Sequence, residues 1–408
     1  MANKNLSAAK KAKQDEFYTQ MNDIQAEINA YLDFDENTFR GKTVLLPCDD
    51  PEWSNFTLFF AQNFERLGLK KLISTSYAPE AKTAKYGSLF EYAASQNGEA
   101  PKNERGKIFV LDHDTNRNGR IDFEDLEWEY LKGDGDFRSE EVCRLRDEAD
   151  VIVTNPPFSM FREFLAWILE GKCCQCENVA NAKTNTQLGI GNIGTGNNST
   201  FSHSAKHFLI IGNKNAITYK EVFPLIKANL IWTGCRGFSG GMWFRADYDE
   251  RTEKIEDGTK LLNVPSIWFT NLDHGRRHQP LQLMTMAQNI KHSKHKEVRG
   301  IGYRTYDNYD AIEVPFTDAI PSDYDGVMGV PISFLDKYCP EQFDILGMCE
   351  NEDLYALKTR VYSHDECQQA YMAKFGKKGT YDLNASGVLT VDGIQEKVYQ
   401  RILIRRRG

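Results

Sequence analysis

A short apolar run that ends in two prolines constrains this chain more than any other part of its sequence. Residues 150–154, Asp-Val-Ile-Val-Thr, read as a buried strand. Asn155, Pro156, Pro157 and Phe158 follow it and lead into a helix-like run over 159–170. The two prolines fix the backbone and remove two N–H donors, which leaves rigid carbonyl groups, an amide and an aromatic ring at the end of the strand. Ligands of open α/β sheets bind at the carboxyl ends of the strands.

This tetrapeptide predicts a site for a flat amine such as adenine. The Asn155 side-chain oxygen and the Pro156 carbonyl can accept hydrogen bonds from an exocyclic NH2 group, while Phe158 covers the face of the ring. The alternative is a strand-to-helix turn that the prolines merely stiffen, because a short motif needs its structural context.

The alternation of apolar runs with helical segments predicts the fold class. Strands are expected at 43–47, 71–75, 107–111, 150–154 and 208–212, and helices at 21–32, 53–67, 139–148, 159–170 and 218–229. The strands are continuously apolar, which is typical of a sheet covered on both faces and hence parallel. The sequence therefore predicts an α/β, doubly wound, mostly parallel Rossmann-like sheet, followed by a C-terminal α+β region.

Composition divides the chain into three parts. Residues 1–14 read as a flexible basic arm, 15–244 as the main α/β domain, and 245–408 as a separate α+β region. Two inserts, 112–130 and 173–205, interrupt the main domain, and the second is rich in Asn, Gly, Thr and Ser.

Charge, hydropathy and cysteine usage narrow the class of protein. The 408 residues carry a net charge of −8, which excludes a uniformly cationic surface but not a local basic cleft. The polar start predicts no secretion signal, and no apolar run approaches the ~20 residues that a membrane span needs. The nine cysteines have no regular spacing, so we expect a reduced, cytoplasmic setting.

The order of several motifs resembles the EcoRI-type adenine-specific DNA methyltransferases. The likeness covers most of the chain apart from the inserts, and it rests on Asp15-Glu16-Phe17-Tyr18-Thr19-Gln20, Cys48-Asp49-Asp50-Pro51, Ser54-Asn55-Phe56, residues 133–139, Asn155-Pro156-Pro157-Phe158, and residues 208–211, 217–223, 306–312, 326–331 and 401–404.

The resemblance implies an activity and its partners. S-adenosylmethionine would be the methyl donor and double-stranded DNA the substrate, with site-specific transfer to the N6 amine of adenine. The biological role would be restriction-modification, with a cognate restriction endonuclease as functional partner, or orphan or phage DNA modification. The rivals are a methyltransferase for another planar amine or amide, such as RNA adenine or protein glutamine, and a catalytically inactive DNA-binding module.

The resemblance also implies site residues. Residues 15–244 would form the S-adenosylmethionine-binding catalytic domain and 245–408 the DNA target-recognition region. The catalytic residues would be Asn155, Pro156, Pro157 and Phe158. The donor would be held by Phe17, Tyr18 and Thr19 at its methionine end, by Asp49, Asp50 and Asn55 after the first strand, and by Asp136 and Phe137 at its adenine. Either Asp49 or Asp50 is the candidate for its ribose hydroxyls.

The chemistry that these residues imply needs no general base. Accepting hydrogen bonds from both amine N–H groups favours a more tetrahedral nitrogen whose lone pair points at the methyl group. The target nucleotide must be flipped out of the duplex, and Phe158 would stack on it. Because Asp49, Asp50, residues 74–77, Asp112 and Asn155 all lie at the ends of predicted strands, we expect them at one edge of the sheet.

Two segments suggest metal sites. Asp114, Asn116, Asn118, Asp122 and Asp125 have the spacing of calcium-loop ligands, with Gly119 at the sixth position. The alternative is an Asx-rich turn that caps a helix. Cys173, Cys174, Cys176, His203 and His207 lack a second paired cluster, so free thiols are preferred over a zinc site.

The densest basic stretch, 274–304, is the candidate DNA-binding surface. Its predicted contacts to phosphates and bases are Arg276, Arg277, Lys291, Lys294, Lys296 and Arg299. The alternative is a solvated charged loop.

Overall fold

The computed structural model divides the chain into two compact units. The first comprises residues 1–216 and 239–272, and the second 217–238 and 273–408. Within them, the structure describes residues 18–52, 54–78, 105–121, 125, 127–170, 206–237, 240–245, 254–256 and 259–407. The predicted arm 1–14, Phe17, Asp122 and the insert 173–205 lie outside the described residues.

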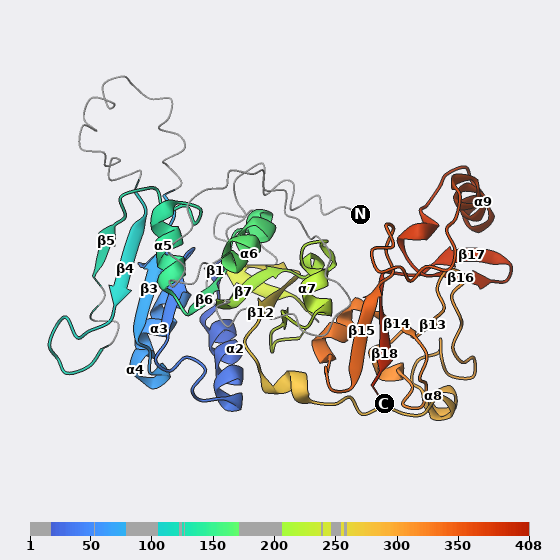
Figure 1. The fold of residues 1–408 in the computed structure, drawn as a ribbon, viewed down its shortest axis with the longest axis horizontal. Coiled ribbons are helices and arrows are strands. Elements are labelled where there is room, and N and C mark those ends of the chain that lie inside the picture. Colours follow the sequence, from blue (N-terminus) through green and yellow to red (C-terminus); the bar gives the residue numbers. More distant parts are fainter. Residues whose placement is uncertain are drawn as a thin grey trace, which may run out of the picture. The chain divides into compact units, whose positions relative to one another are not determined.

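The first unit is a mixed α/β structure (Figure 1). Its helices are α2 (Met21–Phe34), α3 (Asn55–Gln62), α4 (Phe64–Leu67), α5 (Glu140–Glu148) and α6 (Phe161–Leu169), with the 3-10 turn η5 (Phe158–Met160) before α6. Its strands are β1 (Tyr18–Thr19), β2 (Thr43–Leu46), β3 (Lys71–Thr75), β4 (Lys107–Leu111), β5 (Trp128–Tyr130), β6 (Val151–Thr154), β7 (His207–Asn213), β9 (Met242–Arg245), β10 (Lys254–Glu256), β11 (Thr259–Val264) and β12 (Ser266–Thr270).

The large sheet is partly parallel. Its strands in this unit run in the order β5-β4-β3-β2-β6-β7-β12. The pairs β3–β2, β2–β6 and β6–β7 are parallel, whereas β4 and β5 on one side and β12 on the other are antiparallel. A second, antiparallel sheet has the order β1-β9-β11-β10. The α/β prediction is thus confirmed for a mixed sheet with a parallel centre.

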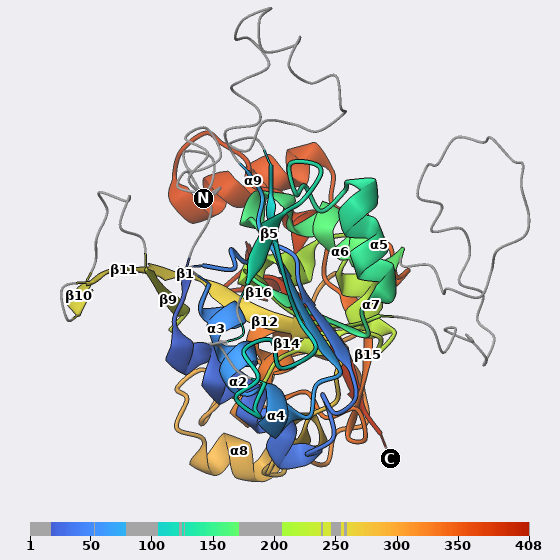
Figure 2. The ribbon, with the colours of Figure 1, turned by 90° about the vertical axis from the view of Figure 1, so that its left-hand side faces the viewer.

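Helices cover both faces of the central strands. Figure 2 shows α2 and α3 on one side of the sheet and α5 and α6 on the other. The α3 helix begins because the Ser54 hydroxyl accepts a hydrogen bond from the N–H of Phe56, and it buries Phe56, Phe59 and Phe60. On the other face, the Phe161 ring lies where a side chain at Gly212 of β7 would collide with it. Aromatic side chains therefore pack at the helix layer on each face of the sheet.

The strand β4 differs from the sequence expectation. It pairs antiparallel with β3, with Leu72 opposite Leu111 and Thr75 opposite Ile108. Its carboxyl end consequently lies at the opposite edge of the sheet from those of β2, β3 and β6. The expectation that Asp112 joins Asp49, Asp50 and Asn155 at one edge was wrong for this reason.

The second unit is built on a smaller sheet in the order β13-β14-β18-β15, with a separate β16–β17 hairpin. Its strands are β8 (Trp232–Thr233), β13 (Ile312–Glu313), β14 (Met328–Pro331), β15 (Phe343–Met348), β16 (Val388–Val391), β17 (Ile394–Lys397) and β18 (Arg401–Arg406). Its helices are α7 (Phe223–Lys227), α8 (Met286–His292) and α9 (His364–Phe375), and its 3-10 turns η7 (Gly275–His278), η8 (Thr317–Ala319), η9 (Ile332–Lys337) and η10 (Leu383–Ala385). The turn η6 (Lys214–Thr218) lies where the chain passes between units.

The described residues contain no helix long and apolar enough to cross a membrane.

Candidate active site

A cavity opens at the carboxyl ends of β2 and β6 in the first unit. β2 pairs in parallel with β3 on one side and with β6 on the other, so the strand order reverses between β2 and β6. Doubly wound sheets bind ligands at such a switch point. The cavity has a volume of about 380 Å³ and is lined by Tyr18, Thr19, Pro47, Cys48, Asp49, Asp50, Ser54, Asn55, Phe56, Ser76, Tyr77, Gly135, Asp136, Phe137, Arg138, Asn155, Pro157 and Met160.

Asp49 is the buried centre of the turn after β2. Its side chain accepts hydrogen bonds from the Ser54 hydroxyl at 2.6 Å and from the Thr154 hydroxyl at 2.6 Å. Its backbone N–H donates to Thr75, and its carbonyl accepts from the Ser74 hydroxyl. The residue is 6% exposed, and burial raises the pKa of Asp49 to about 6 although both hydroxyls favour the charged form.

Asp50 presents a more accessible carboxylate on the same turn. One oxygen accepts from the backbone N–H of Glu52 at 2.9 Å, and the other lies 3.4 Å from the Lys107 ammonium. Lys107 also contacts the Glu52 carboxylate and lies over the Trp128 ring. Because β4 is antiparallel, its first residue lies at this edge of the sheet. Lys107 therefore brings a positive charge beside the two acidic groups.

The strand β1 forms another part of the cavity wall. The Asn55 amide donates to the carbonyl of Thr19 at 2.8 Å and so ties α3 to β1. Tyr18 and Thr19 pair with Arg245 and Phe244 of β9. The Thr19 hydroxyl is buried and makes no hydrogen bond with any described residue. Thr19 was among the residues predicted from the sequence.

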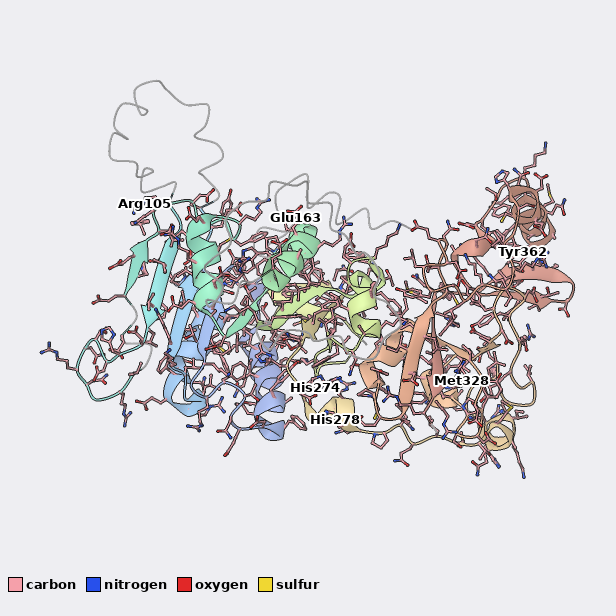
Figure 3. All side chains as sticks on the ribbon, viewed as in Figure 1. Arg105, Glu163, His274, His278, Met328 and Tyr362 are labelled. Carbon is pink, nitrogen blue, oxygen red and sulfur yellow. The ribbon has the colours of Figure 1, made fainter. Side chains whose placement is uncertain are left out.

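The loop over residues 133–138 closes the side of the cavity near Ser76. Gly135 has a φ of +78°, and a Cβ there would collide with the Ser76 carbonyl oxygen. Asp136 accepts from both the Nε of Arg138, at 2.9 Å, and its terminal nitrogen, at 2.6 Å. Arg138 also reaches Glu163 of α6, labelled in Figure 3. The pKa of Arg138 rises because of the Asp136 hydrogen bonds.

Phe137 packs against the core. Its ring lies edge-on to those of Phe164, with centroids 5.1 Å apart, and Trp167, at 5.6 Å. With 6% of its surface exposed, it offers little surface to the cavity that it lines.

The Asn-Pro-Pro-Phe turn stands at the end of β6, as predicted. Asn155 and Pro157 line the cavity, whereas Pro156 is buried. Phe158 is 4% exposed, and its ring meets Phe244 of β9 edge-on at 6.2 Å. The structure therefore brings the amide and one proline to the cavity, while the aromatic ring is covered.

The predicted DNA contacts lie in the second unit and fall into two groups. Arg277 is 7% exposed, donates to Asp273 at 2.8 Å and to Asn229 at 2.7 Å, and lies over the Trp232 ring. Arg276 donates to Asp336 at 2.6 Å. Figure 3 marks their turn by His274 and His278. These two arginines hold the turn together, so their placement gives no support to a direct contact with DNA.

The other members of the basic stretch are accessible. Lys291, Lys296 and Arg299 are exposed and form no ion pair with another described residue. Lys294 is exposed as well and pairs with Asp318 at 2.7 Å.

The calcium prediction is not supported. The loop carboxylates and amides bind backbone N–H groups: Asp114 accepts from Asn118 and Gly119, and Asp125 accepts from Thr115 and Asn116. Within the part of the chain that the structure describes, no cluster of acidic, His or Cys groups could hold a metal. The alternative of an Asx-rich turn accounts for these contacts. Of the zinc candidates, only His207 is described, and it lies on β7.

Several cavity residues had no role assigned from the sequence, among them Ser54, Gly135, Arg138 and Met160. Ser76 and Tyr77 were expected only at the ligand-binding edge of the sheet, and they line the cavity. Ser54 and Gly135 stand one position from predicted site residues, Asn55 and Asp136. Both lie in motifs that carry the resemblance, but a serine at a helix start and a glycine in a loop have ordinary structural roles, so neither signals a ligand contact by itself. Met160 follows the proline turn without any chemical signal of its own.

Comparison with known proteins agrees with the earlier resemblance. A family profile described as adenine-specific methyltransferase EcoRI matches residues 5–173 and 199–407. The Type II methyltransferase M.EcoRI of Escherichia coli is 38% identical over 363 residues, which are 86% of this chain and 91% of that protein.

Two mycoplasma proteins are also similar. The Type II methyltransferase M.MpnI of Mycoplasma pneumoniae is 31% identical over 367 residues, covering 88% of this chain and 90% of that protein. M.MgeORF184P of Mycoplasma genitalium is 27% identical over 412 residues, covering 98% of both chains. No solved structure matches the chain significantly. Because the family profile covers most of the sequence, this chain belongs to the EcoRI-type adenine-specific DNA methyltransferases.

Proposed function

We propose that this enzyme transfers a methyl group from S-adenosylmethionine to the N6 amine of a flipped adenine at a specific site in duplex DNA, as the modification half of a type II restriction-modification pair. The observation that carries the proposal is the cavity at the β2–β6 switch point. There Asp49, Asp50, Asp136 and Asn155 line one space. The protein-glutamine and inactive-module rivals do not agree with the family.

The cavity suits the methyl donor. Its volume of about 380 Å³ lies in the range of small-molecule sites. The buried Thr19 hydroxyl and the Asp50 and Asp136 carboxylates offer hydrogen-bond partners for the polar groups of a nucleoside and an amino acid. S-adenosylmethionine, when bound, supplies an electrophilic methyl group.

Asp50 is the better of the two candidates for ribose hydroxyls. Asp49 is enclosed by the Ser54 and Thr154 hydroxyls, whereas the Asp50 side chain is 29% exposed and faces the same cavity. Asp136 and Phe137 would hold the adenine end, and Tyr18 and Thr19 the methionine end. Phe17, adjacent to Tyr18, belongs to the same proposed element.

Asn155 and Pro156 would orient the target amine. Their oxygens accept its two N–H bonds, which directs the nitrogen lone pair toward the donor without a general base. This requires the nucleotide outside the helix, where the base can enter the cavity. Stacking on Phe158 requires that ring to be uncovered, because Phe244 now packs against it.

DNA would be held largely by the region 245–408, with 15–244 as the catalytic domain. Lys291, Lys296 and Arg299 are the proposed phosphate contacts because their charges are exposed. Lys294 can join them if it leaves Asp318.

Single-molecule sequencing of DNA from cells that express the enzyme tests this function, because it reports the modified base and its sequence context together. We expect N6-methyladenine at one recurrent site in wild-type cells and none in cells with Asn155→Ala. Modification of cytosine, or of no base, would contradict the proposal.

A further inference from the structure

Hydrogen bonds to the buried Asp49 carboxylate connect the two turns that form the active-site cavity. The Thr154 hydroxyl donates to one oxygen of Asp49 and the Ser54 hydroxyl donates to the other, each at 2.6 Å. Thr154 is the last residue of β6 and precedes Asn155, while Ser54 caps α3. One carboxylate therefore joins the end of β6 to the turn after β2 and to the start of α3.

The connection is enclosed and has few alternatives. Thr154 is 0% exposed and Asp49 is 6% exposed, so water cannot readily replace the Thr154 hydroxyl. The Asp49 carbonyl is fixed in turn by Ser74 of β3, whose hydroxyl lies 2.7 Å from that of Thr57 on α3. Buried charge-assisted hydrogen bonds of this kind are directional and strong.

We propose that Thr154 is a positioning residue for methyl transfer, which acts by fixing the Asn155 turn to Asp49 and hence to the donor-binding turn. The inference rests on the proposed role of Asn155. Reactions that depend on orientation lose much of their rate when a group shifts by ~1 Å. A loosened Asn155 turn should therefore slow the chemical step while the donor, held mainly by other residues, still binds.

The test compares substitutions that differ only in the hydroxyl. Thr154→Val keeps the shape of the side chain and removes the hydroxyl that donates to Asp49, whereas Thr154→Ser keeps that hydroxyl. In single-turnover assays on duplex DNA with tritiated S-adenosylmethionine, we expect Thr154→Val to slow methyl transfer at least about tenfold. Donor affinity by calorimetry should change by less than about threefold, and Thr154→Ser should keep at least about half of the wild-type rate.

Thr270→Val is the matched control. Thr270 is also 0% exposed and donates its hydroxyl to a carbonyl, that of Phe208, at the antiparallel β12 strand away from the cavity. It should transfer methyl groups at the wild-type rate when folded. If Thr154→Val fails to fold, Thr154→Ala removes the same hydroxyl without placing a methyl group against the carboxylate.

Asn155→Ala, measured in the same series, separates two failures. The positioning role of Thr154 would be overturned if a folded Thr154→Val or Thr154→Ala enzyme transferred methyl groups at the wild-type rate. The proposed function would still stand in that case if the Asn155→Ala enzyme were inactive. An active Asn155→Ala enzyme would overturn the proposed function itself. Equal loss in Thr154→Val and Thr154→Ser would show that packing, not the hydroxyl, matters.

Discussion

At the scale of single residues, burial of the Asp49 carboxylate joins two turns of the cavity but disfavours its charged form. It was predicted from the sequence as one of two acidic donor ligands, and the two could not be distinguished because neighbouring residues in a turn differ only in where the backbone points them. In the folded chain Asp49 is enclosed and Asp50 is accessible. Burial disfavours a charged carboxylate even when hydroxyl groups bind it.

Burial of Asp49 predicts that the free energy of unfolding depends on pH. The pKa of Asp49 is raised by burial from an ordinary value of 3.8 to about 6, which corresponds to roughly 3 kcal/mol. A raised carboxyl pKa favours the folded state at low pH, and this contribution is lost as the pH rises through about 6. Asp49→Asn replaces the titrating carboxyl by a neutral amide and leaves the carboxyl of Asp50 in place. The free energy of unfolding of Asp49→Asn, relative to wild type, should therefore increase between about pH 4 and pH 6 and level off above that.

Urea denaturation of both proteins across that range measures the difference. A difference that stays constant with pH would mean that Asp49 titrates normally.

At the scale of elements, the sequence predicted the parallel centre of the sheet well. The strands at 43–47, 71–75 and 150–154 have compact apolar runs. The structure has β2, β3 and β6 there, and all their residues are buried except Lys71. The β4 strand was misjudged. Its apolar run Ile108-Phe109-Val110-Leu111 looked fully buried, but Val110 is 37% exposed, as on a half-covered antiparallel strand.

Strand direction is not encoded in the strand itself, which explains the error with Asp112. Whether a strand runs parallel or antiparallel to its neighbour depends on the segment that connects the two strands and on which strand of the sheet has an unpaired edge. The proline turn after β6 was predictable because proline restricts the backbone locally. The burial of Phe158 was not, because Phe244, which covers it, is far away in sequence.

The loop at 133–138 gives a prediction at this scale. Gly135→Ala should weaken donor binding and lower the melting temperature, because Gly135 has a φ of +78° and a Cβ would collide with the Ser76 carbonyl beside the cavity. Gly119→Ala is the matched control, since Gly119 also has a positive φ, +85°, but has open space around it. It should cost only about 1 kcal/mol of stability and leave donor affinity unchanged.

Thermal unfolding measures the melting temperature of both variants, and calorimetry measures their affinity for S-adenosylmethionine. Equal effects of the two substitutions would mean that backbone strain, rather than contact with Ser76, controls the loop.

At the scale of the whole molecule, formal charge alone did not identify the accessible cations. The stretch 274–304 is the densest basic stretch of the sequence, yet Arg276 and Arg277 form hydrogen bonds within the second unit. Burial of an arginine depends on partners such as Asp273, Asn229 and Asp336, and an acidic partner distant in sequence cannot be assigned from composition. The exposed members are the ones that a polyanion can reach.

Salt dependence of DNA binding tests that distinction. Replacing Lys291, Lys296 and Arg299 by Ala should weaken binding to all duplexes and reduce the slope by ~0.9 log units per lost phosphate contact. Arg277→Ala should instead lower the melting temperature, because the buried Arg277 side chain would lose its hydrogen bonds to Asp273 and Asn229 and its packing on the Trp232 ring. The folded fraction should keep the wild-type slope. Gel shifts over a salt series, on specific and scrambled duplexes, give both slopes. An unchanged slope in the triple variant would mean that the basic stretch is a solvated loop.

The most direct test of the whole account is methyl transfer by Asn155→Ala, measured together with donor binding. Asn155 lies in the cavity with the predicted donor residues, and its amide is assigned to the adenine amine rather than to the donor. We predict that the folded variant binds S-adenosylmethionine within about threefold of the wild-type affinity and transfers tritiated methyl groups to duplex DNA at least about a hundredfold more slowly. Turnover near the wild-type rate, or loss of donor binding with no effect on the chemical step, would contradict the account.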